Sequence, residues 1–242
     1  QPNYFHDPEK ILDPNVIVAV LGILIAPIAI VFLTQRYFFK GSIEDLGMKK
    51  PFLFPFIQGC AIGFFLKGLA TAFTYLSSAN AVISISPMRD ISPTAWFPYF
   101  AWFSLTLFLN SLSEEMAYRT FPITNSKQYS FSKMLAVVVV TASAFSLVHF
   151  ILEPVVFNKF LYRFSFGVLA GIMFLKRRSL WLIVGLHTGW NFVAIAVSDG
   201  SWRTGVLLNT TDFHNEVLFN ILVLGFVSLV LIAKQLTFQV ER

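Results

Sequence analysis

The stretch from Val16 to Leu33 reads VIVAVLGILIAPIAIVFL and contains no charged side chain. A helix needs about 20 predominantly apolar residues, within a range of roughly 17–25, to cross the hydrocarbon core of a bilayer. Only helices and closed barrels satisfy all of their backbone hydrogen bonds in lipid. The stretch therefore predicts a membrane-spanning helix, and it raises the question of how many more the chain contains.

The composition extends this interpretation to the whole chain. Its 242 residues are 56% hydrophobic and 13% charged, with a mean hydropathy of +0.68. A soluble domain has about 45–50% apolar and about 25% charged residues. No polar stretch is long enough to form a second domain, so we expect one integral-membrane domain over residues 1–242. The net charge of +5 is spread among short loops, which argues against a nucleic-acid-binding surface.

Apolar stretches of spanning or nearly spanning length recur along the sequence. We predict an all-α polytopic membrane helix bundle of about seven to eight transmembrane helices. The seven stretches are Val16–Leu33, Phe52–Leu76, Thr94–Leu112, Met134–Ile151, Phe160–Leu175, Ser179–Val197 and Val217–Ala233.

The loop charges predict an orientation. Most of the richly basic loops fall on one side of the seven spans, and cytoplasmic loops are enriched in Lys and Arg. We therefore expect the amino terminus outside and the carboxyl terminus inside. The loop with Lys159 and Arg163 does not fit, and an eighth or re-entrant segment, for example within Ile83–Tyr99, would overturn the assignment. The run from Ser84 to Pro98 contains three prolines and predicts a loop or interfacial connection.

Small residues recur at the spacing that lets two helix backbones approach closely in a membrane. They form three pairs, Gly59/Gly63, Gly167/Gly171 and Gly185/Gly189. We expect these pairs to be packing sites.

Charged residues interrupt the apolar pattern in NSLSEEMAYRTFP, which runs from Asn110 to Pro122. Ionisable residues at membrane depth are costly and usually face a protein interior or a water-filled cavity. Glu115 and Arg119 are four residues apart, with the acid first, which predicts an ion pair on one helix face. Glu114 is rotated by about 100 degrees from Glu115, so we expect it to point elsewhere and to be free for chemistry. The alternative is an interfacial salt-bridge cluster that caps the helix.

Two further segments place polar side chains in apolar helices. SAFSLVHF ends near His149, and LHTGWN places His187 and Asn191 four apart on one helix face. The pair Gly185/Gly189 lies on roughly the opposite side, where it could pack tightly while His187 and Asn191 point inward. Lys67, near the middle of the second span, either snorkels to an interface or indicates that the span boundaries are wrong.

Together these segments supply one carboxylate, two imidazoles and one carboxamide. A carboxylate and a histidine can activate a water, and a histidine with an asparagine can stabilise a developing oxyanion. Glu114, His149 and His187 would also make a His₂Glu zinc site with an open position. Both routes lead to hydrolysis of an acyl bond, and the sequence has neither the G-x-S-x-G nor the H-E-x-x-H motif.

Three motifs resemble those of the CPBP or Abi family of membrane proteases, which includes the type II CAAX prenyl endopeptidases. EEMAYR (Glu114–Arg119) matches EExxxR, FSLVH (Phe145–His149) matches FxxxH, and HTGWN (His187–Asn191) matches HxxxN. The resemblance covers about residues 100–197, the expected catalytic core. The motif arginine is followed by Thr120-Phe121-Pro122 instead of the family's usual glycine and aliphatic residues.

The resemblance implies a role for each matched residue. Glu114 would activate the water with His149, and His187 and Asn191 would stabilise the oxyanion. Glu115 and Arg119 would support the site. It implies an endopeptidase that acts on membrane-associated or leader peptides. We expect no cofactor, with zinc held by Glu114, His149 and His187 as the alternative.

Other functions stay open at this stage. A non-catalytic membrane scaffold of the same family would bind another membrane or envelope protein, and a proton-coupled transporter would use the glutamates as a relay. The expected partners are a peptide or protein substrate and the lipid bilayer, with no nucleic acid and an unknown oligomeric state. The compact size favours a bacterial inner membrane.

Overall fold

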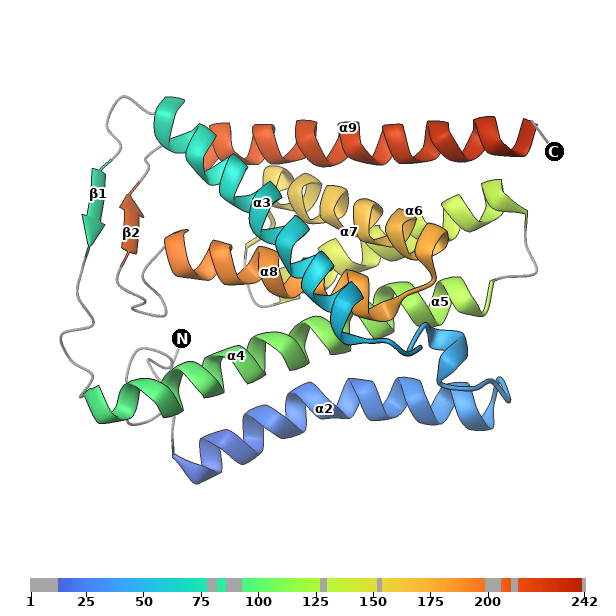
Figure 1. The fold of residues 1–242 in the computed structure, drawn as a ribbon, viewed down its shortest axis with the longest axis horizontal. Helices are drawn as coiled ribbons and strands as arrows, with labels where there is room; N and C mark the ends of the chain where they lie inside the picture. Colours follow the sequence, from blue (N-terminus) through green and yellow to red (C-terminus); the bar gives the residue numbers. More distant parts are fainter. Residues whose placement is uncertain are drawn as a thin grey trace.

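The computed structural model describes residues 13–77, 82–85, 93–126, 130–151, 154–198, 206–209 and 213–240. Long helices dominate this part of the chain and run back and forth along one direction (Figure 1). They are α2 (Pro14–Tyr37), α3 (Leu53–Ser77), α4 (Pro93–Glu115), α6 (Phe131–Val148), α7 (Phe157–Arg177), α8 (Leu180–Ser198) and α9 (Phe213–Val240). Each of the seven predicted spans is a helix, so the predicted helical membrane bundle is confirmed.

Length and apolar composition together identify the helices that could cross a membrane. Among the described residues, three helices are long and apolar enough to cross a membrane: Pro14–Tyr37, Leu53–Ser77 and Phe131–Ile151. Leu180–Ile195 within α8 and Leu218–Ala233 within α9 are further apolar helical segments. The first of these spans, α2, starts where the Asp13 side chain accepts a hydrogen bond from the Asn15 backbone N–H (2.8 Å), with Pro14 in the first turn.

A short sheet joins two connections that are far apart in the sequence. Strand β1 (Val82–Ile85) pairs antiparallel with β2 (Val206–Asn209), with Ile83 opposite Leu208. The prediction of a connection from Ser84 to Pro98 is wrong in its last part, because α4 begins at Pro93. Residues 86–92 lie outside the described residues.

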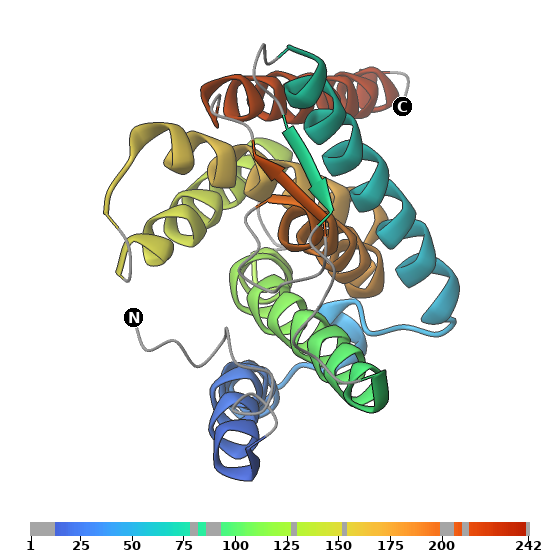
Figure 2. The same cartoon turned by 90° about the vertical axis from the view of Figure 1, so that its left-hand side faces the viewer.

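Helix α8 lies near the middle of the bundle when the molecule is viewed from the end that carries the sheet (Figure 2). Its contact with α3 is made backbone to backbone. A Cβ atom added at Gly59 would meet the carbonyl oxygen of Leu182, and one added at Gly185 would meet that of Phe56. Gly63 and Gly189 make equivalent contacts. The predicted packing role of these glycines is therefore confirmed.

The third span continues past its predicted end as one composite helix. Helix α4 is followed by the π-helical turn η3 (Met116–Thr120) and by α5 (Phe121–Thr124). The backbone N–H of Phe121 donates to the Met116 carbonyl, five residues back. Pro122 has no N–H to donate to the carbonyl of Tyr118, which is a common reason for a helix to change its winding.

This composite helix brings Glu114 and His149 to a similar depth. The Arg119 guanidinium lies 3.9 Å from the centre of the Phe145 ring on the antiparallel helix α6. Glu114 lies five residues before Arg119, and His149 lies four residues after Phe145. Because the two helices are antiparallel, both residues lie toward the same end of the bundle.

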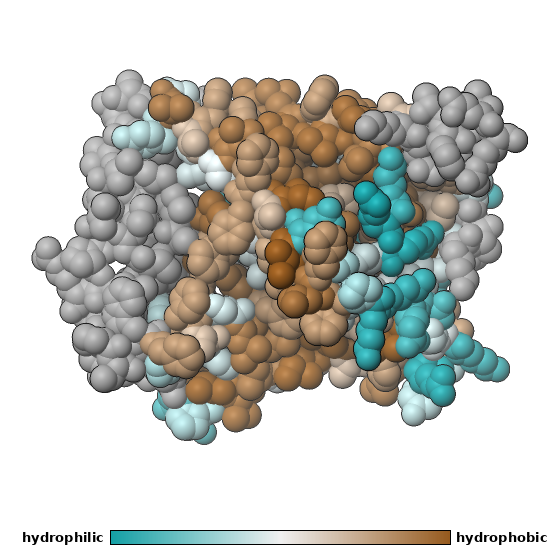
Figure 3. Space-filling view, in the orientation of Figure 1, coloured by the Kyte–Doolittle hydropathy of each residue, from teal (hydrophilic) through white to brown (hydrophobic). Residues whose placement is uncertain are grey.

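Basic side chains collect at one end of the bundle. The connection from α2 to α3, which contains the 3₁₀ turn η2 (Glu44–Leu46), and the turn from α7 to α8 both lie there. Figure 3 shows hydrophilic residues gathered toward that end and apolar residues over most of the rest of the visible face. The exposed apolar side chains include Ile23, Ile30, Phe54 and Phe65, as expected for surfaces that face lipid.

Candidate active site

Glu115 lies at the centre of a buried polar cluster. Its side chain is 0% exposed, and its Oε1 accepts a hydrogen bond from the Nδ1–H of His187 at 2.7 Å. The Nη1 of Arg119 lies 3.2 Å from the same oxygen and forms the predicted ion pair. Glu115 therefore has two partners, of which the helical spacing predicted only Arg119.

Glu114 was expected to point away from Glu115, but it contacts the same histidine from a more exposed position. Its side chain is 22% exposed, and its Oε1 accepts a hydrogen bond from Asn110 Nδ2 at 3.3 Å. Its Oε2 lies 3.5 Å from the Nε2 of His187. His187 thus faces one carboxylate with each ring nitrogen, and both motif glutamates reach the same imidazole.

His149 completes the cluster from the end of α6, in the 3₁₀ turn η4 (His149–Ile151). Its Nδ1–H donates to the Phe145 carbonyl at 2.7 Å, because a carbonyl oxygen only accepts. In the neutral ring this leaves Nε2 as an acceptor. His149 is close enough to Glu114 and His187 to interact electrostatically with both.

Asn191 lies one turn after His187 on α8 and is partly exposed. Within the described part of the chain, no residue forms a hydrogen bond with its side chain. Its amide is therefore available to a ligand, which is compatible with the predicted role.

Aromatic rings enclose the cluster on the side of α6 and α7. The Phe145 ring centre lies 4.8 Å from that of His149 and 6.1 Å from that of His187, and Phe166 packs 4.9 Å from His187. A Cβ atom at Gly167 would lie 2.9 Å from Nη2 of Arg119. The missing side chain at this position makes room for the buried guanidinium.

Several buried polar atoms of the cluster have no hydrogen-bond partner among the described residues. They are Oε2 of Glu115, the three guanidinium nitrogens of Arg119 and Oγ of Ser111. The Arg119–Glu115 contact is an ion pair whose geometry is not that of a hydrogen bond. Buried polar atoms are usually satisfied by protein, water or ligand, so this part of the bundle suits a water-containing reaction site.

The donor atoms of the cluster bear on whether it can hold a metal ion. Within the described residues, no group of three or more His, Cys, Asp or Glu side chains is placed to hold a metal ion. His187 directs Nδ1 to Glu115, and His149 directs Nδ1 to a carbonyl. These bonds leave Nε2 of each neutral ring free to accept, as in metal-binding histidines, so zinc held by Glu114, His149 and His187 stays the alternative.

Lys67 differs from both sequence interpretations of it. It is 3% exposed and lies 5.7 Å from the Tyr162 ring centre and 5.8 Å from that of Trp190. A lysine that snorkels to an interface would be exposed, so that interpretation is wrong. The span boundaries are also correct, because α3 runs from Leu53 to Ser77.

The sequence reasoning missed two residues that shape the site. Asn110 holds Glu114, and the i, i+4 spacing between them was visible in the sequence. Gly167 accommodates Arg119, but this contact joins two separate helices. No local pattern in the sequence could reveal it.

The fold and the cluster define a helical membrane protein that buries Glu115 and His187 within its bundle, with the partly exposed Glu114 beside them. Residues 95–193 match the family model described as type II CAAX prenyl endopeptidase Rce1-like. The match supports a relation of this part of the chain to the CPBP or CAAX-protease-like family, which is a family of proteases. The matched region contains all three motifs. No curated protein and no solved structure matches the chain.

Proposed function

We propose that this protein is an intramembrane endopeptidase in which Glu114 activates a water molecule. The observation that carries the proposal is the arrangement of two glutamates on the two nitrogens of His187, with His149 close by. General bases and oxyanion donors are found together in this way at hydrolytic sites.

In the proposed reaction, the Glu114 carboxylate takes a proton from water while the water oxygen attacks the carbonyl carbon of the scissile peptide bond. Nε2 of His149 is an acceptor in the neutral ring and helps to hold this water. The carbon–nitrogen bond then breaks, and the proton taken by Glu114 passes to the leaving amine. The products are a new carboxylate and a new amine, so one water is consumed per bond.

His187 and Asn191 stabilise the oxyanion in this proposal. Because Nδ1–H of His187 donates to Glu115, Nε2 donates to an oxyanion only from the imidazolium form. The Asn191 amide donates in every protonation state. Glu115 and Arg119 act as positioning residues, since Glu115 fixes the His187 ring and Arg119 holds Glu115.

We propose that the reaction needs no metal. Within the described residues, no three His, Cys, Asp or Glu side chains are grouped so as to hold a metal ion, which supports this mechanism. The measurement is the zinc content of the purified chain, with activity assayed before and after chelation. Stoichiometric zinc that leaves together with activity would overturn the metal-free mechanism.

The proposed substrates are membrane-associated or leader peptides. Vesicles containing the wild-type chain or Glu114→Gln are compared by mass spectrometry of newly formed peptide ends, with a farnesylated CAAX peptide added as one defined probe. We expect cleavage products in the wild type and in the control Ser143→Ala, a hydroxyl outside the cluster that bonds its own helix. We expect none in Glu114→Gln. Unchanged cleavage in Glu114→Gln would contradict the mechanism and favour the scaffold alternative.

We propose a bacterial cell membrane as the location, with the basic end of the bundle in the cytoplasm. The concentration of basic side chains around the α2–α3 connection and the α7–α8 turn supports this orientation. Because Cys60 is the only cysteine, a Cys60→Ser, Lys49→Cys variant carries one reactive thiol at this end. We expect an impermeant thiol reagent to label it only after permeabilisation of the cells. Labelling of intact cells would reverse the orientation.

A further inference from the structure

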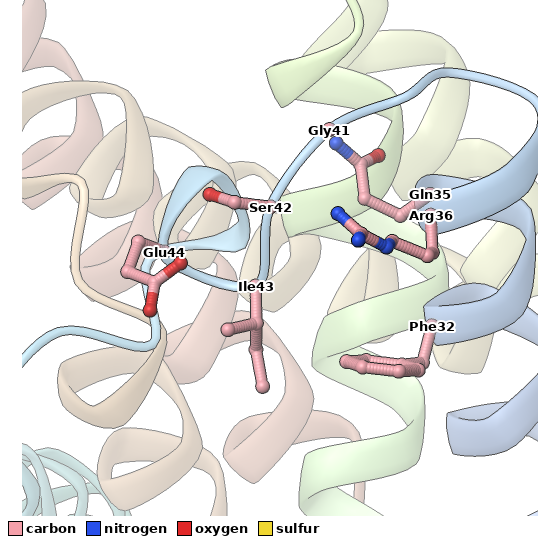
Figure 4. Close-up of a pocket in the computed structure, with 7 residues that line it drawn as sticks. All are labelled: Phe32, Gln35, Arg36, Gly41, Ser42, Ile43 and Glu44. Atoms are coloured by element: carbon pink, nitrogen blue, oxygen red, sulfur yellow. The ribbon is translucent and has the colours of Figure 1, made fainter.

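A cavity lined by both polar and apolar side chains lies at the basic end of the bundle, away from the glutamate cluster. Its volume is about 240 Å³, and Figure 4 shows its lining residues. Phe32, Gln35 and Arg36 come from the last turns of α2, and Ser42, Ile43 and Glu44 come from the following connection. Pockets for drug-sized molecules are roughly 300–1,000 Å³, so this cavity suits a smaller group.

The cavity contains a buried donor aimed at its interior. Gln35 is 3% exposed, and its Oε1 accepts a hydrogen bond from Asn125 Nδ2 at 2.9 Å. This bond fixes the amide orientation, and Figure 4 shows the amide nitrogen turned toward Gly41. Within the described residues, no acceptor takes the hydrogens of that nitrogen.

Charges of opposite sign also line the cavity. Arg36 and Glu44 are both exposed, and neither forms a salt bridge with a described residue. The neighbouring Asp45 is already engaged, since its Oδ2 accepts from the Ser42 backbone N–H (2.8 Å) and from the Ser42 hydroxyl (3.2 Å). The available carboxylate is therefore that of Glu44. A ligand that carries both a phosphate and an ammonium group complements this lining.

The surroundings indicate a lipid as the source of such a ligand. Only 6% of the 18-residue apolar segment of α2 is buried inside the bundle. This helix therefore presents an apolar surface that leads up to the cavity. Tyr37, Phe38 and Phe39 follow directly and are exposed. Tyrosines such as Tyr37 are enriched at the level of the lipid headgroups.

The wall of the cavity is held in place by contacts with the rest of the bundle. The Thr124 hydroxyl donates to the Asp45 carbonyl at 3.0 Å, and the Leu180 backbone N–H donates to the Gly47 carbonyl at 3.1 Å. Leu46 is fully buried. The connection is therefore pre-organised, which lowers the entropic cost of binding.

We propose that this cavity binds the headgroup of an aminophospholipid, with the phosphate at Arg36 and Gln35 and the ammonium group at Glu44. Phe32 and Ile43 contact the glycerol and the first acyl carbons. The site does not depend on the proposed peptidase reaction.

The test is native mass spectrometry of the purified full chain with palmitoyl-oleoyl phosphatidylethanolamine, phosphatidylcholine and phosphatidylglycerol in equal amounts. We expect retention of phosphatidylethanolamine over the other two. Arg36→Gln should weaken this binding about tenfold, as expected for one lost charge-assisted contact. Glu44→Gln should abolish the preference for phosphatidylethanolamine over phosphatidylglycerol.

Lys49→Gln is the matched control, because Lys49 is an exposed cation of the same connection that does not line the cavity. It should bind like the wild type. Equal loss of binding in Lys49→Gln and Arg36→Gln would show general charge attraction and overturn the proposal. Preferred binding of phosphatidylglycerol that Glu44→Gln leaves unchanged would also overturn it.

Discussion

Helix α8 makes two different kinds of contact, one through glycines and one through polar side chains. On one face, Gly185 and Gly189 let the backbone of α3 approach closely, with no polar side chain at the contact points. On the other face, His187 meets two glutamates of α4, and several buried polar atoms have no hydrogen-bond partner among the described residues. The comparison shows that a close backbone contact on one face holds the helix that presents the polar cluster on the other.

The polar face should be the more sensitive to loss of charge. Glu115→Gln removes the carboxylate that serves both Arg119 and His187, and loss of one member of a buried ion pair typically costs about 3–5 kcal/mol. We expect the free energy of unfolding to fall by about this amount, measured by denaturant titration in detergent with tryptophan fluorescence. Cleavage should also be lost.

A double variant sharpens this prediction. Glu115→Gln combined with Arg119→Met removes the buried charge as well as its partner, so it should recover most of the stability. Cleavage should not return, because His187 still lacks its carboxylate. Additive losses in the double variant would show that the two residues are not coupled in folding.

At the glycine contact between α3 and α8, a single added methyl group should lower the free energy of unfolding. Gly63→Ala places a Cβ atom 2.7 Å from the backbone nitrogen of Trp190 and against the Leu186 carbonyl. We expect a loss of about 2–4 kcal/mol, measured in the same titration. Gly68→Ala is the matched control on the same helix, because a Cβ there meets nothing within 4 Å. It should be neutral or stabilising by up to about 1 kcal/mol. Equal behaviour of the two variants would contradict the close-contact interpretation of this face.

The smallest effect should come from the edge of the polar face. Asn110→Ala removes the hydrogen bond to Glu114 but leaves the ion pair intact. We expect cleavage to slow about tenfold, since one such bond is worth about 1.4 kcal/mol, with unfolding little changed. Thr106→Val is the control, because the Thr106 hydroxyl bonds only the Phe103 carbonyl of its own helix. If both variants cleave at the wild-type rate, Asn110 does not position Glu114.

The sequence predicted the helices well and their contacts unevenly. Apolar runs report helices directly, because length and hydropathy alone decide what can span a bilayer. The Glu115–Arg119 pair followed from helical spacing and was found, whereas Glu114, expected to point elsewhere, contacts His187 together with Glu115. These features are local, so a short window of sequence contains them.

Helical spacing in the sequence could not predict the contacts between helices. Helical spacing could not show that His187 turns Nδ1 to Glu115, or that Gly167 lies against Arg119. It also could not show that Lys67 is enclosed by Tyr162 and Trp190. Each of these contacts joins residues on different helices, whose relative rotation no single stretch encodes. The strand pairing of Val82–Ile85 with Val206–Asn209 was missed for the same reason.

The π-helical turn at Met116–Thr120 has a consequence for the register of the chain. It contributes one residue more per turn than an α-helix, and the residues after it are rotated accordingly. Asn110 and the two glutamates lie before the turn. Thr124 and Asn125 lie after it and form hydrogen bonds with Asp45 and Gln35 at the cavity near the basic end. Deletion of one residue within the turn would rotate the downstream segment by about 100 degrees. The glutamate cluster and the cavity wall are thus connected by one composite helix, and their relative rotation depends on one additional residue.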